Sequence, residues 1–262
     1  MALDLLHLTG RRALVTGGGT GLGRQIATGL AAAGAAVTIC GRRLESLREA
    51  AAVIAAAHPD AVAVVSIDAD VTCEADLERL RAEAEPVDIL VNNAGVALHQ
   101  PWATTSVEDW RKTFAINLDA PYRLCQIFIP GMAARGWGRV INVASVYAVV
   151  GGDPQRYPGV PWDKPAYCVA KHGLHGLTHF LAARLAASGV CVNTLSPGGF
   201  AGAEQNRALM TPQVVSALVQ QIPARRLGSE TDLQAAAVFL ASPGAAYVTG
   251  HNLIVDGGWT AI

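Results

Sequence analysis

The feature that most constrains this chain is a strict alternation of short apolar runs with longer segments rich in alanine and leucine. The apolar runs occupy residues 12–16, 36–40, 62–67, 88–91, 139–144, 190–195 and 252–255. Nearly continuous apolar character over so few residues is typical of parallel strands that are covered on both faces. Helical periodicity fills the segments between them, at residues 22–33, 44–57, 74–83, 106–134, 165–187 and 230–240. This order predicts one α/β domain over residues 1–262, with helices flanking a doubly wound parallel sheet.

Glycine and proline refine the boundaries of these elements. Gly34 and Gly189 follow helical segments at positions where a left-handed helix end favours glycine. Pro121 lies inside the fourth helical segment and should bend or divide it. Residues 151–164 contain three prolines and are predicted to form a loop. Residues 198–221, which open into a helical pattern at 206–221, are predicted to form a mobile substrate lid.

Charge and cysteine content exclude several classes of function. The formal net charge of −1 leaves no broad basic field for nucleic acid or for an anionic membrane surface. Five scattered cysteines without CxxC spacing argue against a disulfide framework and against a structural zinc site. No long apolar run of the signal-peptide kind follows Met1. We therefore expect a soluble, cytoplasmic protein that acts on a small molecule.

A glycine cluster, Gly-x-x-x-Gly-x-Gly within residues 17–23, follows the first predicted strand directly. Its spacing differs from the GxGxxG pattern, but the physics is the same. Residues without side chains permit a tight turn and bring backbone N–H groups close to a pyrophosphate. Any tight turn between a strand and a helix can require glycine, but the position after strand one of an α/β sheet favours a nucleotide.

The end of the second predicted strand indicates which nucleotide is bound. Folds that bind NAD place a carboxylate there to hold the ribose 2′-hydroxyl. This chain has Arg42 and Arg43 instead, and a guanidinium suits a 2′-phosphate. The alternative is that both arginines only begin the next helix and face water. NADP(H) is therefore predicted in preference to NAD(H).

Several motifs in a fixed order give the chain a family resemblance. With the glycine cluster, Tyr167, Lys171 and the Asn-Asn-Ala-Gly sequence at 92–95, it resembles the classical short-chain dehydrogenase/reductase family. The match covers essentially the full length, including residues 196–198 and 255–258. The resemblance implies a single Rossmann-type domain that transfers hydride between a nicotinamide and a carbonyl or alcohol. It also implies a homotetramer.

The resemblance assigns cofactor contacts by position. One group would line the phosphates, ribose and adenine: Gly17, Gly19, Thr20, Gly21, Leu22, Gly23, Arg42, Arg43, Asp70 and Val71. A second group would follow the fourth strand and the nicotinamide half: Asn93, Ala94, Gly95, Tyr167, Lys171, Pro197, Gly198 and Phe200.

The same resemblance gives a catalytic set of Asn117, Ser145, Tyr167 and Lys171. Residues four apart share a helix face, so Tyr167 and Lys171 can point into one cleft. A neighbouring ammonium and an oxidised nicotinamide should lower the phenol pKa from about 10 and let the tyrosine act as acid and base. Ser145 would polarise the substrate oxygen, and Asn117 would anchor a water that links Lys171 to solvent.

A second tyrosine competes for the catalytic role. Tyr167 lies 22 positions after Ser145, a longer separation than most family members show, and Tyr157 lies at 12. The fourth residue after Tyr157 is Pro161, so Tyr157 has neither the lysine nor a continuing helix. Tyr167 is therefore the predicted acid and base, and residues 151–164 are an inserted loop near the active site.

The inserted loop is the best clue to the substrate. Candidate substrate residues are Ser145, Tyr147, Arg156, Tyr157 and Trp162, a polar and aromatic mixture that suits a hydroxylated or carboxylated molecule. The chain resembles family members similar to gluconate 5-dehydrogenase, so a sugar acid or polyol is the first choice. Reduction of a 3-oxoacyl thioester is the alternative enzyme activity, and a nucleotide-binding sensor or scaffold is the non-enzymatic one.

Three histidines recur at helical spacing after the catalytic lysine. His172, His175 and His179 contain an HxxxH pattern that can bind a metal ion. No acidic partner lies nearby in the sequence, so packing or subunit contact is predicted and no metal site.

Overall fold

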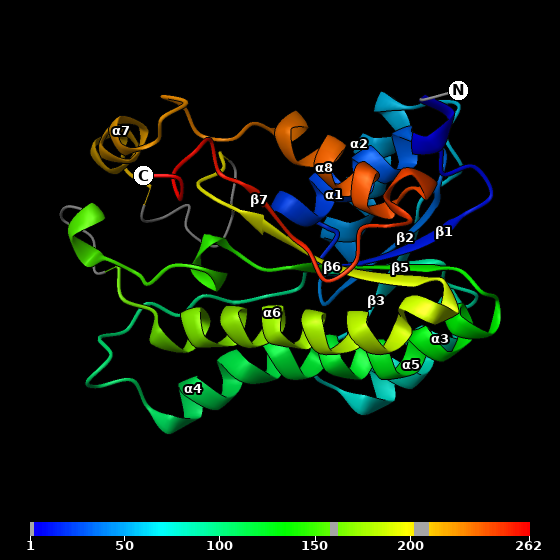
Figure 1. The fold of residues 1–262 in the computed structure, drawn as a ribbon, viewed down its shortest axis with the longest axis horizontal. Helices are drawn as coiled ribbons and strands as arrows, with labels where there is room; N and C mark the ends of the chain where they lie inside the picture. The colour runs from blue at the N-terminus through cyan, green and yellow to red at the C-terminus, as the bar shows by residue number, and fades with distance from the viewer. Residues whose placement is uncertain (1–2, 158–161, 202–209) are drawn as a thin grey trace.

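In the computed structural model, which describes residues 3–157, 162–201 and 210–262, parallel strands form a single sheet (Figure 1). Its seven strands within these residues are β1 Arg12–Thr16, β2 Ala36–Gly41, β3 Val65–Asp68, β4 Ile89–Asn92, β5 Gly138–Val143, β6 Val190–Pro197 and β7 Asn252–Val255. Their order across the sheet is β3-β2-β1-β4-β5-β6-β7. The prediction of a doubly wound parallel sheet is confirmed.

The winding direction reverses beside β1. Val15 of β1 pairs with Ile39 of β2 on one side and with Val91 of β4 on the other. The chain passes outward from β1 to β3, then returns to place β4 against the opposite edge of β1. At such a switch point the loops after the two strands diverge, and a crevice opens at the carboxyl edge of the sheet.

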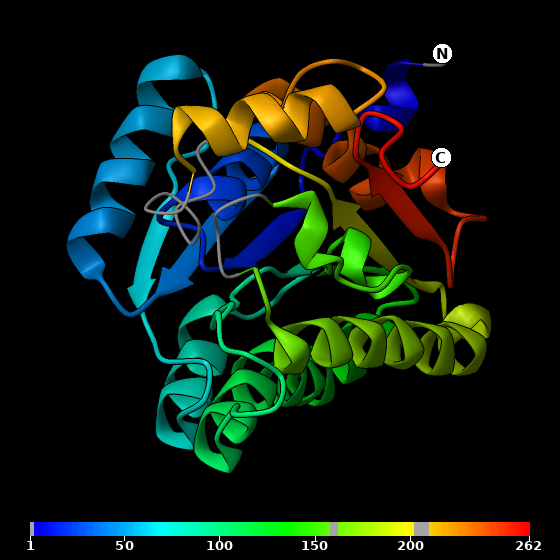
Figure 2. The ribbon, with the colours of Figure 1, turned by 90° about the vertical axis from the view of Figure 1, so that its left-hand side faces the viewer.

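Helices cover both faces of the sheet (Figure 1). One layer contains α1 Gly21–Ala32, α2 Leu44–Ala57 and α8 Glu230–Ala241. The other contains α3 Glu74–Ala84, α4 Val107–Phe114, α5 Ala120–Ala134 and α6 Pro165–Leu185. A further helix, α7 Pro212–Gln221, lies at the carboxyl edge. In Figure 2, which looks at that edge, α7 and α6 lie on opposite sides with the segment 146–157 between them.

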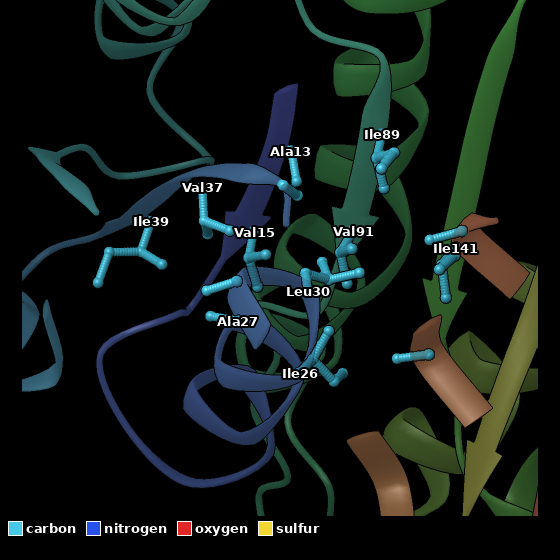
Figure 3. Close-up of a cluster of buried hydrophobic side chains, with 14 of the residues drawn as sticks. Ala13, Val15, Ile26, Ala27, Leu30, Val37, Ile39, Ile89, Val91 and Ile141 are labelled. Atoms are coloured by element: carbon cyan, nitrogen blue, oxygen red, sulfur yellow. The ribbon is translucent and has the colours of Figure 1, made fainter. Parts of the chain in front are cut away.

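Each strand supplies side chains to two separate cores, because successive residues point to opposite faces. Val15 packs with Ile26 and Leu30 of α1 in the core under α1 and α8 (Figure 3). Leu14 points the other way and packs with Phe128 of α5. All five side chains are at most 2% exposed. Burial on both faces explains why the strands are apolar throughout and do not alternate with polar residues.

The predicted helix over 106–134 is divided, as Pro121 suggested. α4 ends at Phe114, a π-helical turn occupies Ala115–Asp119, and α5 begins at Ala120. Pro121 has no N–H to donate to the carbonyl of Asn117 four residues earlier, so the regular helix cannot continue through this point. The break therefore falls at the turn that carries a predicted catalytic residue.

Other boundaries that the structure describes agree with the predictions except at the edge strand. Gly34 and Gly189 have positive φ angles of 96° and 76°, as predicted for helix ends. β3 begins at Val65 and not at residue 62, because an edge strand pairs with one neighbour and its ladder on β2 starts there. The helix of the predicted lid is present from Pro212, and residues 202–209, where it was expected to start, lie outside the described part of the chain.

Membrane insertion receives no support from helix length. Within the residues that the structure describes, no helix is long and apolar enough to cross a membrane.

Candidate active site

A cavity of about 600 Å³ opens at the carboxyl edge of the sheet, beside the crevice between β1 and β4. All eighteen residues predicted to contact the cofactor line it, and so do the four predicted catalytic residues. The sequence and the fold thus bring the glycine cluster and the tyrosine–lysine pair to one site, although about 150 residues separate them.

The glycine turn is shaped so closely that two positions admit no side chain. Gly17 has a φ of +62°, which disfavours other residues. A Cβ on Gly23 would lie 2.2 Å from the carbonyl oxygen of Gly17. The turn runs directly into α1, whose first N–H groups have no partner within the helix. This backbone cradle at a helix N-terminus fits a pyrophosphate.

Thr16 ties the glycine turn to the turn after β4, a role that sequence analysis missed. Its hydroxyl accepts hydrogen bonds from the backbone N–H groups of Asn93 at 3.0 Å and Ala94 at 2.9 Å. The Asn93 side chain donates to the Thr16 carbonyl at 2.8 Å. A threonine at the end of a buried strand shows no such partner in the sequence, since the second turn is nearly 80 residues away.

The end of the cavity beside β2 contains cations. Arg42 and Arg43 are exposed and line the cavity directly after β2. The loop after β3 is held in shape by Asp70, whose carboxylate accepts from the N–H and hydroxyl of Thr72 at 2.9 and 2.7 Å. The donor set beside β2 is therefore cationic, which fits a phosphate better than a ribose hydroxyl.

The first two turns of α6 place Tyr167 and Lys171 on the same side of the helix. Lys171 Nζ lies 5.5 Å from the centroid of the Tyr167 ring and donates to the Val143 carbonyl at 2.8 Å. The hydroxyl of Ser145, which follows β5, lies close enough to the Tyr167 phenol to lower its pKa. A phenol, an ammonium and a hydroxyl therefore meet at one point of the cavity.

Burial controls the protonation of this pair. It raises the pKa of Tyr167 to about 12, although the Ser145 hydroxyl opposes the rise. It lowers the pKa of Lys171 to about 7. In the protein alone the phenol pKa is therefore raised, whereas the lowering predicted from the sequence also requires an oxidised nicotinamide and stays a prediction. Desolvation acts on both partners and favours the neutral form of each.

Asn117 is fully buried in the π-helical turn. Its amide donates to the carbonyls of Val96 at 2.8 Å and Thr113 at 2.9 Å. A Cβ on Gly95 would lie 2.7 Å from Asn117 Oδ1 and 3.6 Å from Lys171 Nζ, so both side chains approach that glycine. Asn117 thus holds the loop after β4 near Lys171, and the water that it would anchor stays a prediction.

An aromatic cluster, to which the predicted loop 151–164 contributes Tyr157 and Trp162, forms one wall of the cavity. The hydroxyls of Tyr147 and Tyr157 hydrogen-bond to each other, and Trp162 Nε1 donates to Tyr147 at 3.0 Å. The rings of Tyr157 and Trp162 stack with centroids 3.9 Å apart. All three residues are buried and line the cavity together with Trp259 near the carboxyl end of the chain. Residues 158–161 of the loop lie outside the described part of the chain.

The cation of this loop that lines the cavity is Lys164, whereas the sequence predicted Arg156. The Arg156 guanidinium lies 4.6 Å from the ring centroid of Trp259 and 3.9 Å from Asp153, and Arg156 is not among the lining residues. Lys164 lines the cavity and is buried. A lysine directly before a helix normally indicates an exposed position, so the sequence carried no signal for this burial.

The histidines on α6 lie away from the cavity lining. The rings of His175 and His179 are 4.3 Å apart between centroids, and burial with neighbouring histidine charges lowers the pKa of His175. The described residues contain no group of three histidine, cysteine or acidic side chains positioned for a metal ion.

These groups can move a proton beside a groove shaped for a dinucleotide. A phenol can exchange a proton with an alcohol or carbonyl oxygen, and a serine hydroxyl can hold that oxygen in place. A bound nicotinamide would supply or accept the hydride. This combination defines the class of Rossmann-type, nicotinamide-dependent oxidoreductases.

Comparisons with known proteins identify the family. A family model described as "Enoyl-(Acyl carrier protein) reductase" matches residues 17–260. Galactitol 2-dehydrogenase of Cereibacter sphaeroides is 36% identical over 259 residues, 98% of this chain and 97% of that protein. The 3-oxoacyl-[acyl-carrier-protein] reductase of Escherichia coli is 36% identical over 253 residues, 97% of this chain and 98% of its own.

A solved relative extends the similarity to the fold. The structure of a gluconate 5-dehydrogenase from Burkholderia cenocepacia, in complex with NADP and tartrate, matches with a TM-score of 0.87. It is 34% identical, and the match covers 100% of both chains. The chain belongs to the short-chain dehydrogenase/reductase family. It is an oxidoreductase that acts on CH–OH groups with a nicotinamide dinucleotide.

Proposed function

We propose that this enzyme interconverts a secondary alcohol and a ketone on a sugar acid or polyol, with NADP(H) as its cofactor. The observation that carries the proposal is the meeting of Tyr167, Ser145 and Lys171 in the cavity that the glycine turn also lines. Relatives whose names specify galactitol and gluconate support this substrate class.

Each side chain would have a separate task. Tyr167 would give its proton to the substrate oxygen in reduction and take it back in oxidation. Ser145 would hold that oxygen through its hydroxyl. Lys171, whose lowered pKa lies near neutrality, would return the proton to Tyr167, and Asn117 would keep Lys171 connected to solvent. The buried surroundings strengthen each of these contacts.

The direct test is Tyr167→Phe. With NADPH absorbance followed against a panel of sugar-acid and polyol ketones, turnover should fall by about 10²- to 10⁴-fold, the usual contribution of a general acid. NADPH binding, measured by fluorescence titration, should change little because the ring stays in place. Turnover that survives the substitution would contradict the proposed mechanism.

A second candidate activity is the reduction of 3-oxoacyl thioesters. The similarity to the Escherichia coli reductase favours it, since coverage and identity equal those of the polyol relative. Acetoacetyl thioesters in the same panel separate the two activities. A kcat/KM for thioesters well above that for every sugar-acid or polyol ketone would favour this alternative.

The preference for NADP(H) rests on Arg42 and Arg43. Both follow β2 and line the cavity, so either guanidinium can form a charge-assisted hydrogen bond to a 2′-phosphate. Replacing each in turn by alanine should lower the ratio of kcat/KM for NADPH to that for NADH by about 10- to 100-fold in at least one variant. An unchanged ratio in both variants would reject the assignment.

We also propose that the enzyme is a cytoplasmic homotetramer. Exposed apolar side chains on α6, Val169 and Phe180, and on α5, Tyr122, support helix contacts between subunits. All five cysteines are free, which suits a reducing compartment. Light scattering that gave a monomer mass, or fractionation that placed the protein outside the cytoplasm, would contradict the respective assignment.

A further inference from the structure

Lys164 is a buried lysine that the proposed mechanism does not use. It follows the inserted loop, lines the active-site cavity and is 6% exposed. Its Nζ lies 4.1 Å from the ring centroid of Trp162, 5.0 Å from that of Tyr147 and 5.1 Å from that of Tyr167. Three aromatic rings therefore surround this ammonium, and one of them belongs to the catalytic tyrosine.

The aromatic rings stabilise the charge but leave its N–H groups without acceptors. An ammonium has three N–H donors. The face of an aromatic ring attracts the positive charge but has no lone pair that accepts a hydrogen bond. Within the described residues, neither a hydrogen-bond acceptor nor a carboxylate partner is found for Lys164 Nζ. The adjacent carboxylate of Asp163 is engaged elsewhere, because it accepts from the backbone N–H of Trp102 at 2.7 Å.

Burial makes this position unfavourable for a charge without a partner. It lowers the pKa of Lys164 to about 8, with desolvation as the largest cause. A buried cation normally persists when an anion and hydrogen-bond acceptors compensate the lost hydration. The cavity that Lys164 lines is a place from which a ligand can supply such acceptors.

We propose that Lys164 binds a carboxylate of the substrate and selects sugar acids over neutral polyols. This inference rests on the proposed function and assigns its substrate class. A carboxylate supplies both the charge and the lone pairs that the aromatic cage lacks. A neutral hydroxyl supplies only a lone pair, and the low dielectric of the site increases the difference.

The position of Lys164 suits a carboxylate close to the reacting carbon. The ammonium groups of Lys164 and Lys171 lie 5.1 and 5.5 Å from the centroid of the same Tyr167 ring. An oxygen held by the Tyr167 phenol and Ser145 is therefore only a short carbon chain away from Lys164. Arg42 and Arg43 lie beyond the end of β2, at the other end of the cavity, so the two cationic regions would bind different anions.

The experiment compares matched ligands on matched variants. Calorimetry measures how tightly C4 and C6 sugar acids, and polyols of the same length, bind to the enzyme–NADPH complex. These are dead-end complexes, in which no turnover occurs. Lys164→Met removes the charge but keeps the apolar stem, whereas Lys164→Arg keeps the charge. Arg156→Met removes the cation that the sequence suggested. NADPH affinity and circular dichroism report whether each variant is folded.

In the wild type, at least one acid should bind more tightly than its neutral counterpart. Lys164→Met should weaken binding of that acid by about 10- to 100-fold and binding of the polyol by less than about threefold. Lys164→Arg should retain part of the preference for the acid over the polyol, and Arg156→Met should retain all of it.

Three results would overturn the proposal. The first is a wild type that binds no acid more tightly than its neutral counterpart. The second is an equal loss of affinity for acid and polyol in Lys164→Met. The third is a preference for the acid that is lost in Arg156→Met but not in Lys164→Met. Because the experiment measures binding and not turnover, it distinguishes failure of the carboxylate site from failure of the proposed function. Acid selectivity at Lys164 without turnover of any sugar acid or polyol would reject the proposed function and keep the carboxylate site.

Discussion

Replacing Lys171 by methionine should change how folding stability depends on pH. Lys171 is 4% exposed, and burial lowers its pKa from an ordinary value of 10.5 to about 7. Between these two values the unfolded chain holds the lysine proton and the folded protein does not. Because the unfolded state then binds more protons, the stability of the wild type rises with pH over this window. Below pH 7 the full cost of a buried ammonium is present.

The size of the effect follows from the pKa shift. Each pKa unit corresponds to about 1.4 kcal/mol, so the buried ammonium costs about 5 kcal/mol below the folded pKa. About 2.5 kcal/mol of this should be recovered between about pH 6.5 and about pH 9. Methionine has a similar length and does not titrate, but it loses the hydrogen bond to Val143, a loss of about 1 kcal/mol at any pH. Lys171→Met should therefore be about 3 to 4 kcal/mol more stable than the wild type at pH 6.5 and about 1 kcal/mol at pH 9.

The measurement is urea unfolding of the protein without added cofactor, followed by circular dichroism at several pH values. Lys112→Met is the matched control, because Lys112 is an exposed lysine on α4 and its substitution should leave the curve parallel to that of the wild type. Parallel curves for Lys171→Met and the wild type would refute the reasoning. A wild type that loses stability relative to Lys171→Met as pH rises would do the same.

Three further substitutions test other parts of the structure. Thr178, whose buried hydroxyl makes three hydrogen bonds of 2.9–3.0 Å, should lose about 2 kcal/mol of unfolding free energy as Thr178→Val and much less as Thr178→Ser in urea titrations. Gly23→Ala, which forces a methyl group against the carbonyl of Gly17, should weaken NADPH binding at least about tenfold in fluorescence titrations; unchanged affinity would contradict the proposed phosphate cradle. The hydrogen bond from Arg226 holds the Asp232 pKa below its ordinary value, so stability from this carboxylate is present at neutral pH and lost in acid. Asp232→Asn should therefore have a lower melting temperature than the wild type at pH 7, and the difference should shrink progressively as the pH falls below about 4.

The sheet and the dinucleotide groove were predictable because their signals are local. Each strand is indicated by a run of four to six largely apolar residues, and each helix by its own periodicity. Gly23 is required by contacts within its own turn, and Tyr167 and Lys171 meet through helical spacing alone. Such features do not depend on distant parts of the chain, so their residues could be assigned before the fold was known.

The substrate side could not be predicted in the same way, because tertiary contacts determine it. Arg156 and Lys164 lie eight residues apart, and the sequence favoured the arginine as the polar contact in the loop. In the structure Arg156 packs against Trp259, about 100 residues away in the sequence, and does not line the cavity. The cage around Lys164 needs a ring from each of three separate positions, Tyr147, Trp162 and Tyr167. Spacing along the chain does not show that these rings converge.

The positions of Lys164 and Lys171 have a common physical reason, which is the difference between lysine and arginine as buried cations. Of the twenty basic residues only three are lysines, and all three line the active-site cavity. A guanidinium stays charged in proteins, whereas an ammonium can lose its proton when it is desolvated. A proton-transfer step needs a cation of the second kind, and Lys171 is buried where desolvation brings its pKa to about 7. Burial lowers the pKa of Lys164 as well, to about 8, so a carboxylate that enters the cavity would stabilise the charge that binds it.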